Sequence, residues 1–409
     1  MIKHDNLRRL YEAANRDRKP QRFFEDLDMA FRERQVRPAD FSVRKLIENF
    51  IPDGRELIDS WNPSQGGAGY AMPEGPRYWG QVGTGLQLLE TSSNVGMGAF
   101  AHISGQIVFN AIMDAFMMED AVFSGVVPTV QTSFNGERIP GITRMGDEAA
   151  VVDEGQPYPH AGVTEDYIDT PQTLKRGLKI GITKEAAFFD RTGILLQRCA
   201  EVGEFLAVNK EKRVIDCVID ENVTTHRYNW RGNVIATYGD SSGTHSWDNL
   251  VASNALVDWT DVDNAEQNLA AITDPNTGEP VVVTPTDLIV TRDLLYTARR
   301  VVMATEIQVV TPGYATSGNA TLTTTRNPIQ NYRILTSLLL KARMATDSSW
   351  FIGNVSKAFK YMQNWPMTVV QAPANSQDEF DRDIILQHKA SERGAASTHE
   401  PRYMNKSTA

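Results

Sequence analysis

Residues 174–220 read LKRGLKIGITKEAAFFDRTGILLQRCAEVGEFLAVNKEKRVIDCVID, and this stretch decides the fold. At its start, Leu178, Ile180 and Ile182 alternate with polar or small residues, and this period of two predicts a half-buried strand. Asp190 can cap a helix that continues to the end of the stretch, roughly 45 Å at 1.5 Å per residue. The stretch therefore predicts a strand followed by one long helix.

The apolar residues of the predicted helix form a single stripe. Leu195, Cys199, Val202 and Leu206 step by four, three and four residues, which is the spacing of one helical face. The two cysteines of the chain, Cys199 and Cys217, are about 27 Å apart on an intact helix, too far for a disulfide. We interpret them as small buried apolar residues in a reducing compartment.

The segment before this strand is acidic and long. Residues 130–139 contain Asn135-Gly136 between two strand-like runs, which predicts a hairpin with a two-residue turn in which both residues take positive φ. Residues 145–174 contain no Lys or Arg and have little apolar content, so we expect this loop to lie on another surface rather than pack on itself. Its carboxylates are Asp147, Glu148, Asp153, Glu154, Glu165, Asp166 and Asp169.

A basic run directly follows the acidic loop. Lys175, Arg176 and Lys179 would be a solvated strand face if considered alone. Beside the acidic loop of an adjacent copy, the same run would form half of a repeated contact between subunits. The candidate inter-subunit residues are therefore Asp147, Glu148, Asp153, Glu154, Glu165, Asp166, Lys175, Arg176 and Lys179.

Composition bounds the class of protein. The chain has 409 residues, 41% of them hydrophobic and 22% charged, which is ordinary for a soluble globular protein with two or three packed regions. The net charge of -10 argues against a dedicated nucleic-acid binder. Residues 1–45 carry a net charge of +4, which favours a solvated amphipathic helix over a contact with a polyanion. No stretch approaches eighteen apolar residues, and residues 1–5 lack the apolar run of a signal peptide, so neither a membrane span nor a secretory leader is expected.

The remaining chain alternates short helices and strands without a repeat. Residues 62–85 are rich in Gly and Pro and predict a linker. Residues 99–118 predict a buried apolar helix. In the second half, residues 262–272 predict a short helix, residues 281–283 and 334–340 predict short strands, and Thr291 can cap a helix that continues to about residue 304, among further short elements. Strands that pair over long sequence distances, with scattered helices, predict an α+β fold rather than a βαβ series.

Signals of catalysis are weak. Gly239-Asp240-Ser241-Ser242-Gly243, next to His245, is close to a serine-protease nucleophile motif, but the fourth position departs from it and the composition is that of a turn. The acidic loop lacks the alternate ligand spacing of a calcium loop, and the histidines form no zinc pattern. No dinucleotide or phosphate-loop motif is present. We therefore expect no catalytic residue, cofactor or metal.

The chain resembles the tailed-phage major capsid proteins, which share the Hong Kong ninety-seven fold with encapsulin cages. The similarity spans roughly residues 95–409. It is carried first by residues 142–149 (ITRMGDEA), 154–159 (EGQPYP), 183–186 (TKEA), 189–193 (FDRTG) and 209–213 (NKEKR). The second part is residues 350–406, with NWP at 364–366, FDRDI at 380–384, ERG at 392–394 and EPR at 400–402.

The resemblance implies a division of the chain. Residues 1–90 would be a helical N-terminal segment with a Gly/Pro-rich linker, residues 91–128 an N-terminal arm, and residues 129–182 an extended loop lying over a neighbouring subunit. A peripheral domain with the long helix as its spine would comprise 183–222 and 345–409, and an axial domain would comprise 223–344.

The resemblance also implies a function. The expected protein is structural and self-assembles into hexamers and pentamers of an icosahedral shell around double-stranded DNA, which it would touch non-specifically. Scaffold, portal and decoration proteins are possible partners, assembly would occur in the host cytoplasm, and the final location would be the virion. One alternative is an encapsulin-type cage holding a cargo enzyme. Another is a hydrolase that uses Ser241 and His245, or a metal with Asp153 and Glu154.

Overall fold

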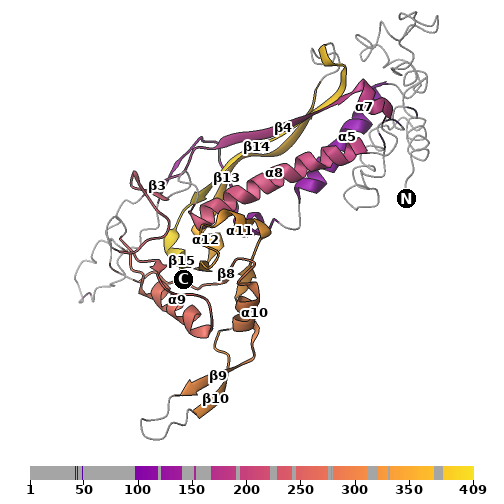
Figure 1. Ribbon diagram of the computed structural model, residues 1–409. Helices are drawn as coiled ribbons and strands as arrows, with labels where there is room; N and C mark the ends of the chain where they lie inside the picture. The colour runs from indigo at the N-terminus through magenta and orange to yellow at the C-terminus, as the bar shows by residue number, and fades with distance from the viewer. Residues whose placement is uncertain are drawn as a thin grey trace, which may run out of the picture. The chain divides into compact units, whose positions relative to one another are not determined.

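A computed structural model describes residues 42, 44, 48, 97–117, 121–140, 152, 167–189, 194–221, 228–241, 246–274, 278, 280–311, 321–329, 332–372 and 381–409 (Figure 1). The chain divides into two compact units. Unit 1 comprises Met1–Met118, Lys175–Val208 and Pro366–Glu392. Unit 2 comprises Glu119–Leu174, Asn209–Trp365 and Arg393–Ala409.

Helices and strands are mixed along the chain, which confirms the α+β prediction. The helices are α5 (Met97–Phe116), α6 (Val122–Val126), α7 (Lys184–Phe189), α8 (Ile194–Ile219), α9 (Trp259–Ala271), α10 (Leu295–Met303), α11 (Leu338–Arg343), α12 (Val355–Ala358) and the 3-10 turn η4 (Pro401–Tyr403). The strands are β1 (Thr129–Gln131), β2 (Arg138–Pro140), β3 (Tyr167–Asp169), β4 (Leu174–Thr183), β5 (Tyr228–Trp230), β6 (Asn233–Ile235), β7 (Leu250–Val251), β8 (Asp287–Ile289), β9 (Glu306–Thr311), β10 (Thr321–Arg326), β11 (Arg333–Leu335), β12 (Trp350–Gly353), β13 (Phe359–Gln371), β14 (Ile384–Thr398) and β15 (Met404–Ser407).

The predicted long helix is α8. It has 26 residues, about 39 Å at 1.5 Å per residue, and both free cysteines lie buried on it as expected. Asp190, the expected cap, lies outside the described residues. In unit 1, α5 packs closely against α8, because a Cβ atom added at Gly203 would lie 2.1 Å from the Ile112 carbonyl oxygen. The prediction of a buried apolar helix holds for one face of α5, where Ile107 and Ile112 are fully buried, whereas Phe109 is 39% exposed.

A four-stranded sheet in the order β1-β13-β14-β4 contains the longest strands of the chain. The expected strand at Leu178–Ile182 is part of β4. Its burial is graded rather than alternating, since Leu178 is 41% exposed and Ile182 is 2% exposed. Within the described strands, β4 is the last member of this sheet, so one of its edges has no strand partner there.

Unit 2 is built on a five-stranded sheet in the order β11-β8-β12-β15-β7. On one side of β12, Phe351 joins a core cluster with the C-terminal turns of α8, including Val214 and Val218. Trp350 and Ile352 point to a second cluster that contains α9 and α10. Successive side chains of β12 thus point alternately into two different cores, so both faces of this strand are buried.

One carboxylate joins α8 to the start of unit 2. Glu211 is buried and accepts hydrogen bonds from the backbone N–H of Phe123 and of Ser124, both at 2.8 Å, and from Ser124 Oγ at 2.6 Å. These N–H groups begin α6, whose own N-cap residue, Ala121, supplies no side-chain bond. Glu211 therefore caps a helix 88 residues away in sequence.

The predicted hairpin around Asn135-Gly136 is wrong. Gly136 does take a positive φ of 85°, but Asn135 does not, and the flanking strands do not pair with each other. Instead β1 pairs in parallel with β13, and β2 pairs antiparallel with β3. The cause is tertiary, since the Asn364 amide donates to the carbonyl oxygens of Thr132 and Phe134 and holds the turn against β13.

Three expected features of the second half also differ. Thr291 does not cap α10, because its hydroxyl donates to the Asp347 carbonyl oxygen and the helix begins four residues later. The strand expected over residues 334–340 ends at Leu335, since Ser337 accepts a hydrogen bond from the Leu339 N–H and starts α11. The strand expected at residues 281–283 is not formed, and only Pro280 bridges to Thr273.

Candidate inter-subunit surface

The predicted basic run lies on the edge strand β4. Lys175 and Lys179 are exposed and four residues apart, so they share one face of the strand, whereas Arg176 is half-buried and faces the opposite way. The structure therefore brings two of the three predicted cations together. Between them, Gly177 lets β14 approach closely, because a Cβ atom there would lie 2.6 Å from the Ala390 carbonyl oxygen.

An exposed strand edge carries unpaired backbone N–H and C=O groups and invites contact with another chain. Lysines on such an edge discourage indiscriminate pairing and select for an acidic partner. Leu174 and Leu178 on the same strand are 54% and 41% exposed, so the strand also offers apolar contact area. The described part of β4 thus combines charge, apolar surface and an open edge.

Most carboxylates of the predicted contact lie outside the residues that the structure describes. Asp147, Glu148, Asp153, Glu154, Glu165 and Asp166 lie outside the described residues. Asp169, on β3, is described and is engaged within its own chain, because Arg138 Nε donates to Asp169 Oδ1 at 2.9 Å. This hydrogen bond and the charge of Asp169 raise the pKa of Arg138, whose guanidinium also lies 4.0 Å from the centre of the Tyr167 ring.

The two ends of the acidic segment are anchored in unit 2 by residues that sequence reasoning did not single out as anchors. Thr170 Oγ1 accepts from the Glu137 N–H at 2.8 Å and donates to the Glu137 carbonyl oxygen. Thr173 Oγ1 donates to Asn135 Oδ1 at 3.1 Å and accepts from Arg393 Nε at 3.0 Å. Only the Arg393-containing ERG motif gave a sequence signal, and it did not indicate the partner. The described residues on either side of positions 141–166 are thus hydrogen-bonded to one another.

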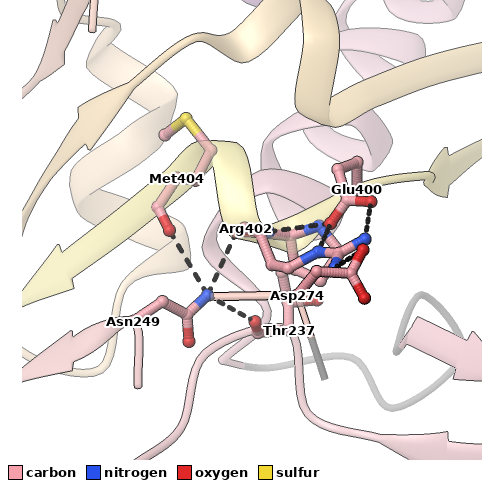
Figure 2. A network of polar contacts seen from close by, with 7 residues as sticks. Thr237, Asn249, Asp274, Glu400, Arg402 and Met404 are labelled. Atoms are coloured by element: carbon pink, nitrogen blue, oxygen red, sulfur yellow. Dashed lines mark hydrogen bonds and ion pairs between the residues drawn. The ribbon is translucent and has the colours of Figure 1, made fainter. Parts of the chain in front are cut away.

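A buried polar network fixes the C-terminal run (Figure 2). Arg402 donates to both carboxylate oxygens of Glu400, at 2.6 Å from Nε and 2.7 Å from Nη2, and its Nη1 lies 3.2 Å from Asp274 Oδ2. Burial by itself lowers the pKa of Arg402, but the hydrogen bonds and charge of Glu400, with the charge of Asp274, outweigh it and raise that pKa. All three side chains are at most 5% exposed.

The neighbouring Asn249 joins three segments of unit 2. It is fully buried, and its amide Nδ2 donates to the carbonyl oxygens of Thr237, Pro401 and Met404 at 3.0–3.3 Å. Its Oδ1 accepts from the Gly239 N–H at 2.9 Å. Figure 2 shows this amide pointing at the carbonyl oxygens of Thr237 and Met404. The network acts as a clamp, because Asn249 binds Pro401 and Met404, 152 and 155 residues away, and Arg402 contacts Asp274.

The alternative catalytic residues do not form a described site. Ser241 is exposed, but Ser242 and His245 lie outside the described residues. In the described part of the chain, no group of three or more His, Cys, Asp or Glu side chains could hold a metal ion. Burial raises the pKa of Cys199 and of Cys217 to about 12, so neither thiol is a ready nucleophile. Among the described helices, none is long and apolar enough to cross a membrane.

Comparisons with known proteins give one clear match. The sequence profile of a family described as phage capsid protein matches residues 167–406, more than half of the 409-residue chain. A search of the curated proteins finds no match.

Several solved structures are similar at low identity. The capsid of a native GTA particle is 11% identical with a TM-score of 0.43, over 71% of this chain and 90% of that one. A virus-like particle from Pyrococcus furiosus is 11% identical with a TM-score of 0.37, over 74% and 97%. Gordonia phage Cozz gives 12% identity and a TM-score of 0.42, over 71% and 86%.

Proposed function

Because this chain belongs to the phage capsid protein family, we propose that it builds an icosahedral shell of hexamers and pentamers around a double-stranded DNA genome. The family membership makes it a structural capsid protein, and the match over residues 167–406 is the observation that carries the proposal. The same match favours a phage shell over the encapsulin-type cage and over either hydrolase. The net charge of -10 suits a container for DNA, since a strongly basic lining would trap the genome.

The division of the chain is part of the proposal. Residues 1–90 would form an added N-terminal segment, 91–128 the arm, and 129–182 the loop that lies over a neighbour. The long helix α8 supports the assignment of a spine to the peripheral domain, residues 183–222 and 345–409. Strands β7, β8 and β11, with α9 and α10, lie within 223–344 and support an axial domain there, and their sheet is completed by β12 and β15 of the segment 345–409.

We infer that the acidic segment within 129–182 of one subunit contacts β4 of the next. The support is the exposure of Lys175 and Lys179 on an open edge strand, together with the hydrogen bonds that join residues 135–137 to residues 170–173 on either side of positions 141–166. Opposite charges placed across many identical contacts would steer subunits together and set their register. Each contact is weak, and the closed shell makes the sum stable.

Charge reversal of the basic run tests this contact. The variant Lys175→Glu, Arg176→Glu, Lys179→Glu should lose most shell assembly in light scattering and sucrose gradients, while its helix content by circular dichroism stays that of the wild type. A control variant with Arg382→Glu and Lys389→Glu changes two other exposed cations of unit 1 and should assemble. Normal shells from the triple variant would remove the contact proposal.

The proposal of a DNA container is tested by what the particles hold. Particles recovered from phage-infected cells should contain DNA that resists added nuclease. Particles containing a single abundant protein and no protected DNA would instead favour the cargo-holding cage.

A further inference from the structure

The outward face of α10 is basic and carries large exposed side chains. Its inward face is buried in the core, with Leu295, Ala298 and Val302. On the outward face, Tyr296 is 72% exposed and Met303 is 69% exposed. Arg299 and Arg300 lie exposed between them, and the exposed Arg292 precedes the helix.

Among the described residues, these arginines have no acidic partner. In the part of the chain that the structure describes, the side chains of Arg292, Arg299 and Arg300 make no ion pair or hydrogen bond. The nearby carboxylate of Asp293 is already used, since Lys341 Nζ lies 2.5 Å from it. Three unpaired guanidinium groups side by side on an acidic protein favour a negatively charged partner.

The chain itself supplies a complementary surface. Residues 232–291 contain nine carboxylates and no Lys or Arg, whereas residues 292–343 contain seven Lys or Arg and two carboxylates. Helix α9 lies in the acidic part and has Asp258, Asp261, Asp263 and Glu266 at or near its first two turns. None of these four carboxylates is buried, and Asp258 is exposed.

Within the described part of one copy, no ion pair joins the carboxylates of α9 to the arginines of α10. Val262 and Leu269 of α9 share a core cluster with Leu295 of α10, so both helices turn their polar faces away from that core. Figure 1 shows α9 and α10 lying apart within unit 2. A subunit with one acidic face and one separate basic face is suited to a head-to-tail contact, in which each copy uses a different face toward each neighbour.

We propose that the outward face of α10 binds the acidic face of α9 on the next copy of this chain around a capsomer ring. This inference rests on the proposed shell function and names one of its contacts. Tyr, Arg and Met are the residue types enriched at protein interfaces, and exposed Tyr296 and Met303 would gain from burial that a phosphate backbone does not provide. The charges set the register and the direction of the ring.

The test exchanges the charges of the two faces. One variant carries Arg299→Glu and Arg300→Glu, and a second carries Asp263→Lys and Gln267→Lys, which changes α9 without touching the Asp258 cap. Each variant alone should reduce shell yield at least tenfold against the wild type, measured by light scattering and gradient sedimentation. A chain with all four substitutions places the two introduced lysines of α9 opposite the two introduced glutamates of α10 at every contact and should recover most of the yield.

Mixing gives a sharper readout. Arg299→Glu, Arg300→Glu subunits alternate favourably with Asp263→Lys, Gln267→Lys subunits, so a mixture should form six-membered rings. Five-membered rings cannot alternate, so the mixture should yield hexamers or open sheets, while the four-substitution chain closes shells. The control variant Arg382→Glu, Lys389→Glu should assemble as the wild type does.

Four results would overturn the inference. Wild-type shell yield from the Arg299→Glu, Arg300→Glu variant would remove α10 from the interface and leave the proposed function intact. Normal assembly combined with weaker retention of DNA would assign the arginines to nucleic acid instead. Failure of the four-substitution chain to assemble, with normal circular dichroism, would show that the two faces do not meet. If the wild type itself forms no shell when expressed with its neighbouring gene products, the proposed function falls and the inference falls with it.

Discussion

At the scale of single residues, buried polar side chains position the elements of this capsid protein. Glu211 caps α6 from the middle of α8, and Asn249 ties three segments of unit 2 together. Gly394 allows the Tyr361 ring to pack directly on its backbone, because a Cβ atom at Gly394 would lie 2.7 Å from that ring. Tyr361 is also held by Arg213, whose Nη1 donates to the Tyr361 hydroxyl oxygen at 3.0 Å.

Two buried histidines make stability depend on pH. His388 is 2% exposed and His399 is 6% exposed, and the Nε2 atom of each has no hydrogen-bond partner among the described residues. Burial lowers the pKa of both to about 4, and the charge of Lys360 adds to the effect at His399. Above about pH 6.5 neither folded nor unfolded imidazole is charged. As the pH falls from about 6.5 to about 4, the two imidazoles become protonated in the unfolded chain but stay neutral in the folded chain. The free energy of unfolding therefore decreases.

We therefore predict that the free energy of unfolding falls between pH 6.5 and pH 4, by up to about 3 kcal/mol for each histidine. The measurement is the denaturant midpoint across this pH range for the wild type and for His388→Gln and His399→Gln. Each variant should show a shallower pH dependence than the wild type, because it lacks one of the two histidines. The carboxylates that titrate in the same range are common to all three proteins, so they do not account for the difference. Parallel curves for the three proteins would contradict this explanation.

At the scale of elements, α5 and α8 pack closely in unit 1. Gly203, in the middle of α8, allows the Ile112 carbonyl of α5 to approach to a distance that any side chain would block. A glycine inside a helix ordinarily costs about 1 kcal/mol relative to alanine. Its presence here is explained by the approach of α5.

Gly203→Ala should therefore lower the melting temperature of the protein by several degrees, although alanine favours helix formation. Gly125→Ala, in α6, is the matched control, because an added Cβ atom there meets nothing within 4 Å. The control should be neutral or slightly stabilising. If Gly203→Ala were as stable as that control in a thermal melt, the close packing of α5 on α8 would be wrong.

The long elements could be predicted from sequence, and the short ones depended on tertiary partners. The spacing of the apolar residues predicted α8 and the strand within β4, although the burial of β4 is graded along its length rather than alternating. The Asn135-Gly136 hairpin failed because the Asn364 amide holds its first half against β13. Thr291 failed as a cap because its hydroxyl has a partner at Asp347, 56 residues away. Neither partner leaves a local signal.

The candidate surface shows the same division. The sequence predicted the basic run at residues 175–179, but only the observed strand separates Lys175 and Lys179 from Arg176 on opposite faces. The change from the acidic residues 232–291 to the basic residues 292–343 is visible in the sequence. The sequence alone does not show which of these charges are available to a partner. The structure adds that the arginines of α10 are exposed and unpaired in the described part of the chain.

At the scale of the whole molecule, the chain is built to meet copies of itself. Unit 1 offers the open, basic edge of β4, and unit 2 offers acidic and basic faces on different helices. Both proposed contacts are charged, so both should weaken as salt is raised. A shell that closes through many such contacts is stable as a whole while each contact stays reversible during assembly.

The central claim is that this family member assembles into a closed shell. Electron microscopy of the full-length protein, co-expressed with its neighbouring gene products and purified by size, tests it most directly. The account predicts hollow particles of uniform diameter built from five- and six-membered rings. Monomers or dimers alone, at every protein concentration and with all neighbouring gene products present, would contradict it.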